Sequence, residues 1–199
     1  MDENLPQPEP DSSVPPRRRK KMTFIELIVL ITVLSALFGL MVTALHRARE
    51  NAWRACCLGN HKQIGLAMRL YSGDFQERFP TDKAWTTLGS FALLTNKYQT
   101  APAVWTCPSE RGGVVPSRGD AWTSKNVSFA YGGFGLTENT QSDTPLMCDR
   151  SSQGDPVGAN PWSQNKWTHK SAGGNVLYID GHVAFVQTLN PPMYRGKNP

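Results

Sequence analysis

The pattern of apolar and polar positions divides the chain into an apolar segment, a one-sided helix and a polar, turn-rich remainder. Phe24–Leu45 has Glu26 as its one charged residue, and a helix of this length crosses about 30 Å of hydrocarbon. The chain has no proline between Pro16 and Pro80. We therefore predict one helix from Met22 to Ser72, about 75 Å long, whose residues 22–45 span a membrane.

The second half of this helix, residues 46–72, has a stripe at alternating spacings of four and three. Such spacing is typical of an amphipathic helix that packs on a globular domain through one face. Gly73 is the expected C-terminal stop. The stripe consists of Trp53, Cys57, Asn60, Ile64, Ala67 and Tyr71.

Residues 73–199 are rich in turn formers and predict a globular head with a small antiparallel sheet. A short helix is expected at Thr86–Thr95 and a strand at Ser128–Tyr131. Apolar runs on both sides of Asp180-Gly181 predict a C-terminal hairpin with a two-residue loop. That loop pairs Ile179 with His182, Leu177 with Ala184, and Asn175 with Val186. The predicted fold class is α+β, with the long helix packed by its second half on the sheet.

The first 21 residues contain five prolines and four acids and end in the basic run Arg17–Lys21. This composition predicts a disordered leader. The apolar segment that follows is longer than that of a signal peptide and is followed by His46-Arg47, so we expect it to be retained. Cations before the span predict a cytoplasmic N-terminus, a single pass through the inner membrane, and an extracytoplasmic, periplasmic head.

The net charge of +5 lies mainly beside the apolar segment. Cations and acids number five and four in residues 1–21, five and two in 22–72, and eleven and ten in 73–199. The head is therefore nearly neutral, which fits a membrane interface better than a nucleic-acid surface. We expect no nucleic-acid partner.

The four cysteines and the scattered acids indicate no resident cofactor. The cysteines form no CxxC pair, and no Cys/His cluster has the spacing of a zinc site. Asp143, Asp149 and Asp155 are the acids considered for calcium, but they lack the spacing of an EF-hand loop. The sequence thus predicts neither zinc nor catalysis.

Residues 21–27 (KMTFIEL) resemble the prepilin signature of type IV pilins and type II secretion pseudopilins. Further motifs along the chain are similar to a bacterial subfamily of pilin-like proteins, whose C-terminal signature is a histidine, nine residues and Asp-Gly. These motifs are 48–50 (ARE), 54–58 (RACCL), 60–67 (NHKQIGLA), 78–80 (RFP), 107–109 (CPS) and 173–183 (GGNVLYIDGHV). The resemblance runs in pieces over residues 17–187.

The resemblance implies a processing site between Lys21 and Met22, recognised by a prepilin peptidase and methylase. It makes Glu26 the position-five carboxylate that attracts a neighbouring subunit's N-terminal amine. This chain departs from the family by having Lys21 in place of glycine and Thr43 where many members have proline. Translation from Met22 would produce the mature end directly.

The resemblance also implies a disulfide between Cys57 and Cys107. Cys148 is the alternative partner and Cys56 the alternative on the helix, and buried free thiols are the alternative to any bridge. In the C-terminal motif of His169, Asp180 and Gly181, ten residues separate His169 from Asp180 instead of nine.

A hydrogen bond from His169 to Asp180 or to the backbone, with Asp180 as a turn residue, is the expected role of that motif. The functional expectation is a non-enzymatic pilin-like or pseudopilin subunit that assembles with other pilin-like subunits through its N-terminal helix. One alternative is an unprocessed single-span protein with a ligand-binding head. The other is a membrane-tethered enzyme that uses His169 and Asp180.

Overall fold

The computed structural model describes residues 22–95, 97–98, 101–110, 123–150, 162, 168–169 and 172–189. The leader with Lys21, and Asp155, lie outside these residues. The chain forms two compact units, Met1–Ala44 and Leu45–Pro199, and each unit is described by itself.

Helix α1 runs from Phe24 to Asp74, close to the predicted Met22–Ser72. It is long and apolar enough to cross a membrane by length and composition. The prediction that Gly73 ends the helix is wrong, because Gly73 lies inside α1. The chain instead turns at Gln76 and Glu77, which both adopt positive φ, and the Glu77 amide donates to the Ser72 carbonyl at 2.8 Å.

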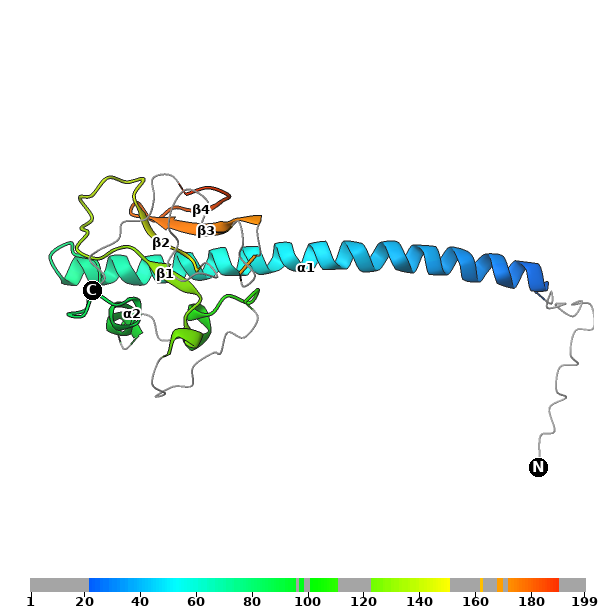
Figure 1. Cartoon of the computed structure of the whole chain (residues 1–199), viewed down its shortest axis with the longest axis horizontal. Helices are drawn as coiled ribbons and strands as arrows, with labels where there is room; N and C mark the ends of the chain where they lie inside the picture. Colours follow the sequence, from blue (N-terminus) through cyan, green and yellow to red (C-terminus); the bar gives the residue numbers. More distant parts are fainter. Residues whose placement is uncertain are drawn as a thin grey trace, which may run out of the picture. The chain divides into compact units, whose positions relative to one another are not determined.

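The second unit contains a four-stranded antiparallel sheet of order β1-β2-β3-β4 (Figure 1). Its strands are Phe129–Tyr131, Pro145–Asp149, Gly174–Tyr178 and Val183–Val186. Helix α2 is Thr87–Thr95, and two 3-10 helices are Pro102–Trp105 and Ser124–Asn126. These elements confirm a long apolar helix with a small antiparallel sheet, and they confirm the expected short helix and first strand.

The sheet is apolar on both faces. One face packs with the second half of α1, where Phe129, Met147 and Leu177 join Ile64 and Met68 in the main core. The other face carries a smaller core of buried residues. That core consists of Ala130, Cys148, Trp162, Val176, Tyr178 and Leu189.

The buried stripe of α1 is wider than predicted, because His61, Gly65, Met68 and Ser72 are also buried. At Gly65 the helix and the sheet are in tight contact. A Cβ at this position would lie 2.9 Å from a Leu177 methyl.

The C-terminal hairpin forms, but its predicted register is wrong by one residue. Leu177 pairs with Val183 and Val176 with Ala184. The Gly181 amide donates to the Tyr178 carbonyl at 2.9 Å, and Gly181 has φ +89. These features make a three-residue loop with a left-handed third residue, in place of a two-residue loop. The faces of β4 are consequently exchanged relative to the prediction.

Candidate functional site

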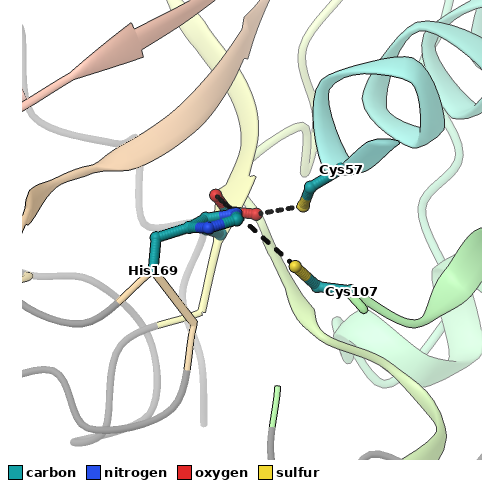
Figure 2. A group of neighbouring side chains, drawn as sticks. Cys57, Cys107 and His169 are labelled. Carbon is teal, nitrogen blue, oxygen red and sulfur yellow. Dashed lines mark hydrogen bonds and ion pairs between the residues drawn. The ribbon is translucent and has the colours of Figure 1, made fainter. Parts of the chain in front are cut away.

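Four chemically reactive side chains from separate parts of the chain meet under the sheet. Cys57 comes from α1, Cys107 follows the first 3-10 helix, Asp149 ends β2, and His169 comes from a later loop. One ligand atom from each lies within 4.8 Å of the others, and all four residues are buried. Figure 2 shows Cys57, Cys107 and His169 pointing toward one another. We call these four residues the Cys–Asp–His cluster.

Asp149 is the hub of the cluster. The Cys57 thiol donates to Asp149 Oδ1 at 3.0 Å. Asn175 donates to Asp149 Oδ2 twice, from its backbone amide at 2.7 Å and from its side-chain amide at 3.0 Å. A fully buried carboxylate is costly without such donors, so β2 and β3 together hold Asp149 in place.

His169 connects the cluster to α1. Its Nδ1 lies 3.1 Å from Glu50 Oε1, and its Nε2 lies 3.5 Å from Cys107 Sγ and 3.6 Å from Asp149 Oδ2. Burial lowers the pKa of His169, but the hydrogen bond with Cys107 and the charge of Asp149 outweigh it and raise that pKa to about 9. The imidazole is therefore protonated at neutral pH.

The two thiols of the cluster differ in acidity. Burial is the main cause that raises the pKa of Cys57, and its hydrogen bond with Cys107 and the charge of Asp149 act in the same direction. For Cys107, hydrogen bonds from Cys57 and His169 outweigh burial and lower the pKa to about 7. Cys107 is thus the more acidic thiol of the pair, and it lies beside the His169 ring.

His61 lies at the edge of the cluster. Its Nδ1 is 2.9 Å from the Cys57 carbonyl, so that nitrogen carries the proton. Burial lowers the pKa of His61, which favours the neutral ring. Its Nε2 has no hydrogen-bond partner and lies 3.7 Å from Asp149 Oδ1. This nitrogen therefore faces the Asp149 carboxylate without a hydrogen bond.

Cys107, His169 and Glu50 have the order of a nucleophile, a base and an orienting carboxylate. However, Cys107 is 1 % exposed, so a substrate has no contact with its sulfur in this structure. The arrangement is suited to holding a cation or forming a cross-link instead.

Of the two hydrogen bonds expected for His169, to Asp180 or to the backbone, the one to Asp180 is wrong. The His169 ring contacts Glu50, Cys107 and Asp149, whereas Asp180 Oδ1 accepts from the His182 amide at 2.9 Å and lies 2.6 Å from His182 Nδ1. The expected turn role of Asp180 and Gly181 fits these contacts. The extra residue before Asp180 does not keep His169 out of the buried cluster.

The cysteine alternatives are separated by their positions. Cys56 is exposed on α1, and Cys148 lies in the core on the opposite face of the sheet. Cys57 and Cys107 are unbonded thiols with neighbouring sulfurs. A disulfide between these two stays a prediction.

Glu26 and Met22 belong to the first unit, and Met22 is exposed. The Thr23 amide donates to Glu26 Oε2 at 2.8 Å, and the Thr23 carbonyl accepts from Leu27 at 3.2 Å. Thr23 is therefore the N-cap, and Glu26 closes half of a capping box. The motif Thr-x-x-Glu was a readable signal for this local role.

Sequence reasoning treated Asp149 only as a calcium candidate and missed Glu50 and His61 as neighbours of His169 and Cys57. Asp149 contacts sulfur and imidazole groups, a mixed donor set that calcium does not prefer. Asp143 is exposed outside this cluster. Calcium binding by these acids therefore gains no support from the described residues.

No protein-family model, curated protein or solved structure matches this chain.

Proposed function

We propose that this protein is a pilin-like subunit, anchored in the inner membrane by α1, that assembles with other pilin-like subunits of a secretion or pilus-type system. Its role is structural, without catalysis. The apolar halves of the helices pack side by side, first in the membrane and then in a filament core. The heads, residues 73–199, form the surface.

The observation that carries this proposal is the exposed apolar half of α1. The candidate span has none of its window buried inside the structure. Phe24, Leu30, Leu34, Phe38 and Leu40 are all 45 % exposed or more. An apolar surface of this extent needs a lipid or protein partner. In the proposed mechanism the apolar half of α1 first contacts lipid in the membrane. It then contacts the same helix of neighbouring subunits in the filament.

Glu26 supports assembly by charge. A carboxylate near the end of an apolar helix is unfavourable in lipid, and a neighbouring subunit's N-terminal amine would neutralise it. The exposed start at Met22 and the prepilin-like residues 21–27 are consistent with a mature end there.

The first test is the intact mass of protein extracted from membranes with and without the prepilin peptidase. We expect a species that begins at Met22. Finding only a species that begins at Met1 would contradict assembly by this route.

The second test is cross-linking within the membrane. We expect a cysteine introduced at Leu34, in a C56S background, to form adducts between copies on oxidation. The matched control is C56S alone, which lacks the reporter thiol. A reporter that yields monomer only would favour the single-span alternative.

That alternative, a ligand-displaying head that does not polymerise, is favoured by one observation. A pocket of about 750 Å³ opens at the end of α1. Its lining mixes aromatic and polar residues, including Tyr71, Arg78 and Trp85. If the Leu34→Cys variant forms no adducts and the extracted protein begins at Met1, ligand binding in this pocket becomes the hypothesis to test.

A further inference from the structure

The Cys–Asp–His cluster contains more binding chemistry than the packing of a head requires. We propose that Cys57, Cys107, Asp149 and His169 form a zinc site that fastens the head to helix α1. This inference is independent of filament assembly, because it concerns the second unit alone.

The donor set fits zinc. Zinc in proteins takes four ligands from thiolate, imidazole and carboxylate groups. With bonds of about 2.0–2.3 Å, neighbouring ligand atoms of a tetrahedron lie about 3.3–3.8 Å apart. The Cys107 Sγ–His169 Nε2 distance is 3.5 Å and the His169 Nε2–Asp149 Oδ2 distance is 3.6 Å. Cys57 Sγ lies 3.0 Å from the other carboxylate oxygen, Asp149 Oδ1. All four ligand atoms lie within 4.8 Å of one another, so a tetrahedron needs shifts of about 1 Å or less.

The surroundings supply the groups that orient ligands. Metal-bound histidines commonly hold their second nitrogen against a carboxylate. His169 Nδ1 lies 3.1 Å from Glu50, whose carboxylate also pairs with Arg54 at 3.5 Å. Asn175 holds Asp149 by two hydrogen bonds. His169 and Asp149 are therefore held in place by Glu50 and Asn175, and these contacts can persist when an ion binds.

His61 provides an independent observation. Its Nε2 is fully buried, lacks a hydrogen-bond partner and points at Asp149 Oδ1 from 3.7 Å. A buried polar nitrogen without a hydrogen-bond partner beside a buried carboxylate is unfavourable. A disulfide between Cys57 and Cys107 would remove the thiol donor of Asp149 Oδ1. A cation bound to Asp149 would take the place of that donor.

The same donors disfavour hard cations. Calcium takes six to eight oxygen ligands, and magnesium an octahedron of oxygens. Two sulfurs and one imidazole nitrogen select softer ions. Cys57 and Cys107 bind as thiolates, and His169 binds through Nε2 as a neutral ring. Their protons leave to solvent when the ion enters.

The site joins four separate segments of the second unit. Cys57 lies on α1, Asp149 on the sheet, and Cys107 and His169 on connecting segments. An ion shared by all four cross-links them. Zinc binding therefore stabilises the folded head, because the unfolded chain does not preform the site.

The experiment uses the full chain in detergent, reduced and stripped of metal, titrated with Zn²⁺ and separately with Co²⁺. We expect one ion per chain, a higher midpoint of thermal unfolding, and a cobalt spectrum with the thiolate charge-transfer and ligand-field bands of a tetrahedral site. Zinc should also slow alkylation of Cys57 and Cys107 while Cys56 still reacts at its metal-free rate.

Variants locate the site. H169Q and C107S should weaken zinc binding at least about ten-fold. C148S changes a thiol on the other face of the sheet and should bind as the wild type does. Circular dichroism checks that each variant is folded, and the wild-type stoichiometry and alkylation results stand without any variant.

Three results would overturn the proposal. One is a folded wild-type chain that binds no zinc. Another is zinc binding that protects neither Cys57 nor Cys107. The third is protein isolated from membranes with a Cys57–Cys107 disulfide in non-reducing peptide mapping.

Discussion

At the scale of single residues, Glu26 has an observed role as a capping residue and a proposed role in assembly, and the two predict different behaviour. As a capping residue it accepts a hydrogen bond from the Thr23 amide within its own helix. In the proposed assembly it would act through its charge on a neighbouring subunit. Glutamine can cap in the same way as glutamate but has no charge. The substitution E26Q therefore separates the two roles.

We predict that E26Q abolishes the adducts of the Leu34→Cys reporter while the amount of protein in the membrane stays unchanged. E26Q and E26A both lose the favourable charge at the helix N-terminus, about 0.3–1 kcal/mol, and E26A also loses the cap. The measurement is adduct yield against total protein. Wild-type adducts from E26Q would reduce Glu26 to a capping residue.

Gly65 and Gly59 give a matched pair on the same helix. In a helix interior, Ala is favoured over Gly by about 1 kcal/mol. At Gly59 a Cβ meets nothing within 4 Å, whereas at Gly65 it meets Leu177, itself fully buried, at 2.9 Å. Overpacking costs about 1–3 kcal/mol.

We therefore predict that G59A raises the free energy of unfolding by about 1 kcal/mol, and that G65A lies about 1–3 kcal/mol below G59A. Chemical unfolding of the detergent-solubilised chain measures both. Equal stabilisation by the two variants would mean that the sheet does not approach α1 at Gly65.

At the scale of elements, periodicity predicted what is local. The stripe that includes Cys57 and Ile64, in a segment without proline between Pro16 and Pro80, was sufficient to predict α1. Asp180-Gly181 between apolar runs was sufficient to place the hairpin. The register was missed because it depends on whether Gly181 lies inside a two-residue turn or follows a type I turn, and the dipeptide alone fits both.

The Cys–Asp–His cluster was not predictable in the same way. Its residues are far apart in the sequence and meet only because β2 pairs with β3 above α1. Asp149 has no neighbouring ligand at zinc spacing in the sequence, and His169 was expected to bond to Asp180 or to the backbone. The sequence lists the ligand types, but only strand order and helix packing bring them together.

The turn elements give a second matched pair. Gly181 has φ +89, a conformation that costs an alanine about 1–2 kcal/mol. Asparagine tolerates it better. Gly73 lies in α1, and a Cβ there meets nothing within 4 Å. We predict that G181A lowers the free energy of unfolding by about 1–2 kcal/mol, G181N by less, and that G73A raises it.

Chemical unfolding of the three variants checks these values. If G73A lowered the free energy of unfolding, this would indicate that the helix ends at Gly73 after all. If G181A left it unchanged, this would contradict the left-handed turn.

At the scale of the whole molecule, membrane orientation can be measured without new reporters. Cys56 is exposed, while Cys57, Cys107 and Cys148 are buried. If the basic run Arg17–Lys21 keeps the N-terminus in the cytoplasm, Cys56 faces the periplasm. We predict that an impermeant maleimide labels Cys56 in intact spheroplasts and that C56S removes this labelling. Labelling that appears only after lysis would place the head in the cytoplasm.

If the protein inserts into a membrane, we expect the apolar half of α1 to be the part that enters lipid. An arginine at the centre of a span costs about 2.5–3.5 kcal/mol on insertion scales. Leu34 lies within the apolar half and is 55 % exposed, whereas Leu66 is 62 % exposed on the half of α1 that carries the head. The same substitution at the two positions thus tests which half meets lipid.

We predict that L34R sharply lowers the fraction of protein that resists alkaline extraction from membranes, and that L66R leaves it unchanged. Both variants add one cation to an exposed position of the same helix, so a general effect of charge on solubility would appear in both. Equal retention of the two variants would contradict insertion through Phe24–Leu45. Loss of both would indicate that the head also contributes to membrane attachment, through the exposed face around Leu66.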